Sequence, residues 1–137
     1  MKSRARFLPL LALPILAGCV NDSASYQNAN RDISVTLIRQ QRWLWDKKVD
    51  AALVISRLPD CQRRHPLEQL SPSARVELWQ PGPGTFVIRR NGAMTLTESQ
   101  TCEGWQALDE EPPGGLGRQL GTFQQEGGKL SFVAAGK

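Results

Sequence analysis

Residues 85–99, Thr-Phe-Val-Ile-Arg-Arg-Asn-Gly-Ala-Met-Thr-Leu-Thr-Glu-Ser, carry the clearest structural signal in the chain. Two stretches rich in apolar and β-branched residues flank the pair Asn91-Gly92. This pair is preferred in two-residue type I′ turns because both central positions need a positive φ angle. The segment therefore predicts a β-hairpin with strands at 85–90 and 93–99, and it favours an antiparallel β fold.

Further strands are predicted on both sides of this hairpin. Apolar and polar residues alternate with the period of a half-buried strand in three stretches, 33–37, 49–56 and 75–80. Residues 122–125 and 129–133 flank Glu126-Gly127-Gly128 and predict a second hairpin. About seven short strands with turn residues between them indicate a small antiparallel β-sandwich or barrel, and the sequence leaves these two open.

The remaining segments predict loops and, at most, short helices. Residues 39–46 are long enough for one or two helical turns, and 65–70 for another, with Pro66 suited to a first turn. Pro81-Gly82-Pro83-Gly84 predicts a break after the third strand. Residues 109–117 contain two prolines and three glycines, which predicts an irregular loop.

The N-terminus has the three blocks of an export signal. Lys2, Arg4 and Arg6 form a basic segment, and an apolar stretch over 7–16 ends in Leu16-Ala17-Gly18-Cys19. The apolar stretch is too short to span a bilayer, which needs about 20 apolar residues. The final four residues resemble the lipobox of bacterial lipoproteins. The alternative is a buried cysteine in an N-terminal core helix.

The resemblance implies that residues 1–18 are a signal peptide, removed once the Cys19 thiol carries a diacylglyceryl group. The new amine is then N-acylated, so no cofactor beyond covalent lipid is expected. Membrane anchoring by these chains is stable, and the partners include the lipoprotein processing and sorting machinery. Val20 follows Cys19, where the family uses Asp for inner-membrane retention, so we expect the outer membrane and a domain facing the periplasm.

The mature chain is expected to begin with a flexible tether and continue as one domain. Residues 19–31 are polar and show no apolar period, which predicts a lipidated tether, and 32–137 predict a single β-rich domain. Loss of the signal leaves 14 basic and 13 acidic residues, a net charge of +1 instead of +4. This balance gives no support for nucleic-acid binding.

Cys61 and Cys102 are the cysteines that remain after lipidation. In an oxidising exported compartment they predict an intramolecular disulfide. The alternative is a metal site formed by both cysteines and His65, which lacks an evident fourth ligand. We therefore predict no metal and a solvated loop position for His65.

A binding surface is predicted at two places. Trp43-Leu44-Trp45 puts three large apolar side chains in succession, so we expect one tryptophan to be partly exposed, with burial of both as the alternative. Arg63 and Arg64 are candidates for binding an anionic or glycan-linked group, or are ordinary solvated charges.

Trp79 and Trp105, in contrast, are predicted in the core or against the disulfide. Residues 31–64 carry net +4 and 98–126 carry net −5, which makes a polarised surface unless folding interleaves them.

Three function classes remain open from the sequence. The first is a non-enzymatic envelope lipoprotein that binds an envelope protein or glycan through Trp43, Trp45, Arg63 and Arg64. The second is an inhibitor or assembly factor that resembles, in architecture alone, the small disulfide-bonded lipoproteins that inhibit lysozyme.

The third class is an envelope hydrolase, which we do not expect. It needs paired carboxylates, for which Glu98, Glu103 and Asp109 are the candidates, or Ser71 or Ser73 near His65. No catalytic motif of a known spacing supports either arrangement, so no catalytic residue is predicted.

Overall fold

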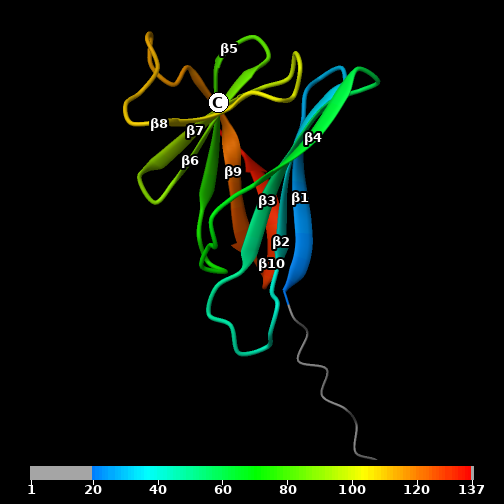
Figure 1. Cartoon of the computed structure of the whole chain (residues 1–137), viewed down its shortest axis with the longest axis vertical. Helices are drawn as coiled ribbons and strands as arrows, with labels where there is room; N and C mark the ends of the chain where they lie inside the picture. Colours follow the sequence, from blue (N-terminus) through cyan, green and yellow to red (C-terminus); the bar gives the residue numbers. More distant parts are fainter. Residues whose placement is uncertain (1–19, 137) are drawn as a thin grey trace, which may run out of the picture.

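The computed structural model describes residues 20–136, which form two antiparallel sheets in a sandwich-like arrangement (Figure 1). The four-stranded sheet has the order β1 (Asn21–Gln27), β2 (Ile33–Gln40), β3 (Asp50–Arg57), β4 (Cys61–Pro66). The six-stranded sheet has the order β10 (Lys129–Ala134), β9 (Arg118–Glu126), β5 (Val76–Gly82), β6 (Thr85–Arg90), β7 (Ala93–Glu98), β8 (Trp105–Leu108). The predicted mainly β fold with a disulfide is confirmed, with ten strands rather than about seven.

Both predicted hairpins are present. Asn91 and Gly92 connect β6 to β7 with φ angles of 49° and 78°, the positive values that the turn requires. Gly127 and Gly128 connect β9 to β10, again with positive φ. Residues 109–117 form an irregular connection as predicted, whereas β5 continues through Pro81 to Gly82 and turns at Pro83-Gly84.

The core lies between the two sheets. Alternate residues of each strand point inward, as the period of two requires. The most deeply buried apolar side chains come from β2 and β3 on one side and from β5, β6 and β9 on the other: Val35, Leu37, Leu53, Ile55, Val76, Leu78, Phe86, Ile88 and Phe123.

The predicted tether is wrong for the described residues, because Asn21–Gln27 is strand β1. It pairs with β2 along its whole length, from Asn21 opposite Gln40 to Gln27 opposite Ser34. Val20, Ala24 and Tyr26 pack against the core. The polar Asp22 interrupts this apolar period, which is why the sequence did not predict a strand here.

Neither predicted helix forms, and the described part of the chain is all β. Residues 39–40 continue β2, and the connection that follows has no regular structure. His65 and Pro66 end β4, which is an edge strand and therefore tolerates a proline. Within residues 20–136, no helix has the length and apolarity needed to cross a membrane.

Ionic contacts close one side of the sandwich, where β1 lies beside β10. Arg39 is 2% exposed and donates from Nε and Nη2 to the two carboxylate oxygens of Asp22, at 2.9 and 2.8 Å. The same carboxylate accepts the backbone N–H of Leu130 at 2.9 Å, and Arg39 also donates to the Pro72 carbonyl. The bond to Arg39 holds the pKa of Asp22 below its ordinary value. We call this cluster the ionic seam.

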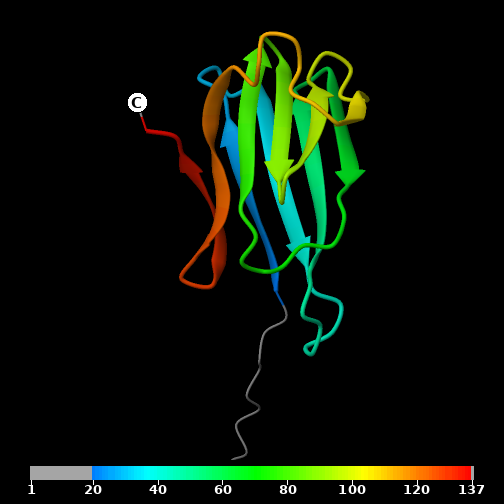
Figure 2. The same ribbon diagram turned by 90° about the vertical axis from the view of Figure 1, so that its left-hand side faces the viewer.

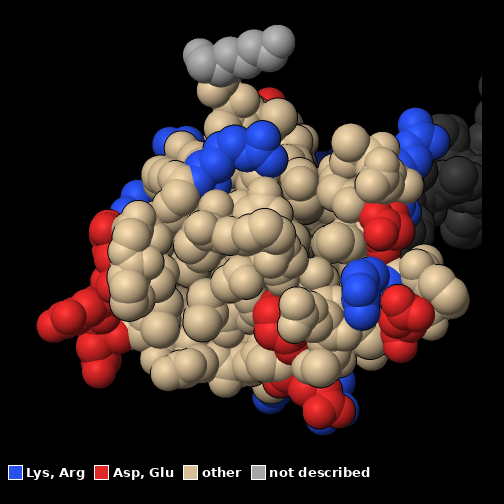
Figure 3. Space-filling model, turned by 90° about the horizontal axis from the view of Figure 1, so that it is seen from above, with Lys and Arg blue, Asp and Glu red and all other residues tan. Residues whose placement is uncertain are grey.

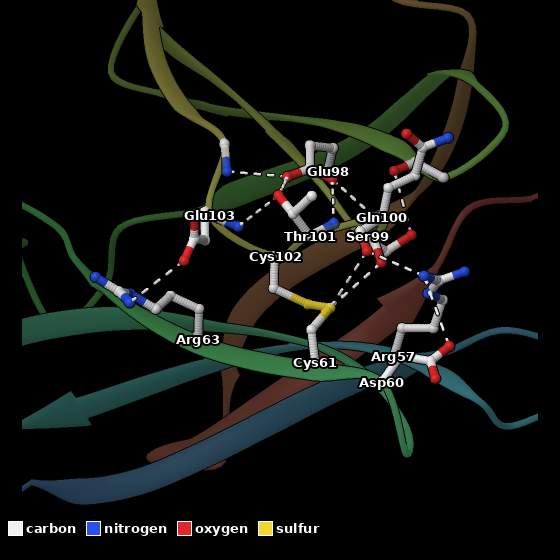
Figure 4. Close-up of a disulfide and its surroundings, with 12 residues drawn as sticks. Arg57, Asp60, Cys61, Arg63, Glu98, Ser99, Gln100, Thr101, Cys102 and Glu103 are labelled. Carbon is white, nitrogen blue, oxygen red and sulfur yellow. Dashed lines mark hydrogen bonds and ion pairs between the residues drawn. A yellow bond between two sulfur atoms is a disulfide. The ribbon is translucent and has the colours of Figure 1, made fainter.

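A disulfide closes the opposite side (Figure 4). Cys61 at the start of β4 is bonded to Cys102 in the β7–β8 connection, with the Cα atoms 5.9 Å apart. Arg57 donates to the Gln100 carbonyl at 3.0 Å beside it, and Arg63 lies 4.0 Å from Glu103. We call this region the disulfide seam.

Candidate functional site

The candidate binding loop is the β2–β3 connection, residues 41–49, at the end of the sandwich where β1 begins (Figures 1 and 2). Gln41 fastens it to the start of β1, because its backbone N–H donates to the Val20 carbonyl at 2.7 Å. The Gln41 side chain accepts the Val20 N–H at 3.1 Å and donates to the Asp46 carbonyl at 2.7 Å. Gln41 therefore connects the loop both to Val20, before β1, and to Asp46 on the other side of the loop tip.

The other leg of the loop is fixed to the domain as well. Val49 is fully buried and exchanges two backbone hydrogen bonds with Leu70, at 2.8 and 2.9 Å. Asp46 donates its N–H to the Trp43 carbonyl at 3.1 Å and closes a turn around the tip. The loop tip thus projects from a fixed base.

Three large apolar side chains lie exposed at this tip. The exposed fractions are 58% for Trp43, 56% for Leu44 and 75% for Trp45. The two indole rings stack on each other, with centroids 5.5 Å apart and planes 10° from parallel. The prediction that one tryptophan is partly exposed is exceeded, since both are.

Cationic residues flank the apolar tip. Arg42, Lys47 and Lys48 are all exposed. Arg42 forms an ion pair with Asp50 at the start of β3. Bonds from Gln69 and then Arg42 lower the pKa of Asp50, so that carboxylate stays ionised. The apolar tip is predicted from the sequence, whereas these cations are not; their signal is the run Arg-Trp-Leu-Trp-Asp-Lys-Lys between two alternating stretches.

The structure does not bring the candidate tryptophans and the candidate arginines together. Arg63 and Arg64 are exposed on β4, opposite Ile55 and Val54 of β3. Val54 lies four residues along β3 from Asp50, or about 13 Å at the rise of a strand. The loop tip extends in the other direction, so the two arginines belong to a separate surface beside the disulfide seam.

His65 is buried rather than solvated. Its side chain points inward from β4, is 7% exposed and stacks on Trp105 at 4.6 Å between ring centroids. Its Nε2 lies 2.8 Å from the Cys102 carbonyl. The histidine is a packing residue of the disulfide seam, and Trp105 lies there as predicted.

Trp79 does not join the core. It lies between the inward-facing positions of β5, and the Arg89 guanidinium stacks over its ring at 5.2 Å. The predicted core position is wrong because the alternation of β5 assigns Val76 and Leu78 to the core.

Glu98 is the most strongly perturbed carboxylate among the catalytic candidates. Burial alone would raise its pKa, but hydrogen bonds from Thr101, Gly104 and Gln100 outweigh burial and lower the pKa to about 2. The four donors are the backbone N–H groups of these three residues and the Thr101 hydroxyl, at 2.6–2.9 Å. A general acid needs a raised pKa instead, so Glu98 organises the β7–β8 connection.

The other catalytic and metal candidates are not brought together. Glu103 reaches toward Arg63, Asp109 is exposed, and Ser71 bonds Ser73 at 3.1 Å. The disulfide removes both cysteine sulfurs as thiolate ligands. Across residues 20–136, no group of three His, Cys, Asp or Glu side chains is arranged to hold a metal ion.

The end of the molecule away from the loop displays charge unevenly (Figure 3). One cluster of acidic side chains projects on the side where the β8–β9 connection lies in Figure 1, and on the opposite side acidic and basic side chains are mixed. Arg63 and Glu103 link the basic and acidic stretches of the sequence. Folding therefore interleaves the two stretches in part.

The sequence and the structure were compared with known protein families, curated proteins and solved structures. No family model, no curated protein and no solved structure matches the chain.

Proposed function

We propose that the protein is a lipid-anchored module of the bacterial cell envelope that binds another envelope component without catalysing a reaction. The observation that carries this proposal is the exposed Trp43-Leu44-Trp45 tip on a fastened loop. The anchoring part rests on the lipobox-like Leu16-Ala17-Gly18-Cys19 sequence. Val20 after the cysteine favours the outer membrane, with the domain facing the periplasm.

The loop is suited to binding on energetic grounds. Three neighbouring apolar side chains at the tip are exposed to water. A partner that covers them would gain about 25 cal/mol of free energy per Å² of apolar surface removed from water. Tryptophan anchors are enriched among residues whose truncation costs about 2 kcal/mol or more in an interface. The stacked rings and the Gln41 bonds restrict the loop before binding, which lowers the entropy lost on association.

Anchoring is tested by replacing Cys19 with Ser in the full chain. The wild type is expected to mature, to carry diacylglyceryl and N-acyl groups on Cys19 by mass spectrometry, and to float with membranes. The Cys19→Ser chain should be neither lipidated nor processed at this cysteine. An unmodified Cys19 in the mature wild type would disprove the anchoring proposal.

Binding is tested in envelope membranes that contain the full lipoprotein. After cross-linking, material recovered with the wild type is compared with that from Trp43→Ala/Trp45→Ala and from Leu58→Ala, an exposed apolar control outside the loop. We expect a lipid, glycan or protein component to be lost only with the tryptophan variant. Equal recovery with all three chains would place the binding surface elsewhere.

A further inference from the structure

The strongest unassigned feature is the position of the apolar tip relative to the chain's entry into the domain. Val20 and Gln41 form a reciprocal backbone and side-chain pair at the base of the sandwich. The loop leaves from Gln41 and extends beyond the start of β1 in both views (Figures 1 and 2). The tip is therefore at the end of the domain where the chain begins.

Because β1 begins at Asn21, only Val20 separates Cys19 from the first strand in the sequence. Asn21 already pairs with Gln40, and Asp22 is held in the ionic seam. Cys19 directly precedes Val20 in the sequence, and one trans peptide bond spans only about 3.8 Å between Cα atoms. A lipid on that cysteine would hold the base of the sandwich against the membrane surface rather than at the end of a flexible linker.

The loop has the composition of a membrane-interface segment. Tryptophan favours the headgroup region because its ring is apolar and its N–H remains hydrated or bonded. The cations Arg42, Lys47 and Lys48 beside the tip match anionic headgroups. Arg42 is directed to Asp50 in the free domain, which leaves the two lysines as the main charge contribution.

We propose that Trp43, Leu44 and Trp45 insert into the membrane interface beside the lipid on Cys19, with Lys47 and Lys48 on anionic headgroups. This inference rests on the proposed anchoring and names the component that the loop binds. The lipid chains hold the protein on the membrane, and the loop is a second contact that fixes how the domain stands on it.

The geometry favours lipid over a protein partner at this loop. A partner would have to enter between the membrane and a tip that is joined through Gln41 to the residue after the lipidated cysteine. The base faces lipid, whereas Cys61 and Cys102 lie at the opposite end of the strands, because Cys61 pairs with Arg57, at the far end of β3 from Asp50. Other surfaces remain accessible from the periplasm.

The test uses the mature lipoprotein in vesicles of phosphatidylethanolamine and phosphatidylglycerol, prepared with and without bromine on the acyl chains. Bromine quenches only tryptophans that lie in or at the membrane. We expect the wild type to lose emission in brominated vesicles. Trp43→Phe/Trp45→Phe should lose almost none, because its remaining tryptophans lie in the body of the domain.

Two matched variants complete the design. Trp79→Phe should retain the quenching of the wild type, since it removes a tryptophan far from the loop. Lys47→Gln/Lys48→Gln should weaken the quenching in anionic vesicles and reduce its dependence on salt, because the salt dependence comes from exposed charges that ions screen. Thermal unfolding under non-reducing conditions verifies that each variant is folded.

The outcomes separate this inference from the proposal on which it rests. A mature protein without lipid on Cys19 would overturn both. A lipidated, vesicle-bound wild type whose emission is the same with and without bromine would overturn only the loop insertion. The loop insertion alone would also be overturned if cross-linking in envelope membranes recovered a protein that covers Trp43 and Trp45.

Discussion

The ionic seam and the disulfide seam close the same sandwich by different chemistry. On one side, Arg39 and Asp22 join β1, β2 and β10 through a buried ion pair and its hydrogen bonds. On the other, Cys61 and Cys102 join β4 to the β7–β8 connection covalently. A small two-sheet domain has open edges, and this one closes one side with an ion pair and the other with a covalent bond. One device depends on oxidation, and the other depends on pH.

Loss of the disulfide should have the largest effect. The bond closes a loop of 41 residues, and the chain-entropy model gives about 4 kcal/mol of stabilisation at this length. We expect the Cys61→Ala/Cys102→Ala chain to lose about that much free energy of unfolding in urea titrations. Reduced wild type should behave like the double variant. A loss below about 1 kcal/mol would show that noncovalent contacts dominate this seam.

The ionic seam should be nearly as sensitive. Asp22→Asn keeps the shape but leaves the buried Arg39 without its counter-charge, and breaking such a pair costs about 3 kcal/mol. Hydrogen exchange should accelerate first in β1 and β10. Asp60→Asn is the matched control, because its exposed contact with Arg57 should contribute less than about 1 kcal/mol. Equal losses from both variants would contradict the buried pair's role.

The contrast between the seams also explains what the sequence could predict. Asn91-Gly92 and Gly127-Gly128 specify hairpins through local turn chemistry alone, so both hairpins are predictable from the sequence. The disulfide is predictable as well, because Cys61 and Cys102 are the two cysteines that remain after Cys19. The strand β1 was missed because Asp22 faces inward and is compensated by Arg39, a partner that becomes visible only when the sheet forms. For the same reason Arg39 was assigned to a helix.

The apolar residues of the candidate binding loop were predictable from the sequence, but the position of the loop at the base of the sandwich was not. Trp43-Leu44-Trp45 stood out from the sequence, but its place at the base depends on β1 pairing with β2, which fixes Val20 beside Gln41. His65 was misplaced because inward orientation in β4 follows from its pairing with β3, opposite Leu53. Both errors come from long-range sheet register, which local patterns do not specify.

The contribution of Glu98, in the disulfide seam, to the stability of the domain should depend on pH in the acidic range. Its pKa in the folded protein is about 2, below the ordinary value of 4.5, so its contribution is fully present above the ordinary value. This contribution is lost as the pH falls toward 2. Glu98→Gln should cost about 2 kcal/mol at neutral pH, because in either orientation the amide NH2 would face at least one backbone N–H donor. The variant's stability should change less between pH 5 and pH 2 than that of the wild type.

That loss has a structural reason besides the hydrogen bonds. Cys102 has a φ of 62°, a region that residues other than glycine rarely occupy, and the Glu98 carboxylate holds the connection in this conformation. Combining Glu98→Gln with Cys61→Ala/Cys102→Ala should therefore cost less than the sum of the separate effects. Full additivity would show that the carboxylate acts independently of the disulfide.

The smallest effect on stability is expected at the loop that neither seam contains. Trp43→Ser/Trp45→Ser removes side chains that are mostly exposed, so the free energy of unfolding should change by less than about 0.5 kcal/mol. Gln41→Ala is the informative comparison, because it leaves the tip intact and removes the bonds to Val20 and Asp46. If the tip acts at the membrane, the serine variant should leave unfolding unchanged and alter the orientation of the domain in vesicles, as measured by accessibility of residues near Val20 to aqueous quenchers. A large loss of stability in the serine variant would instead make the stacked tryptophans part of the fold.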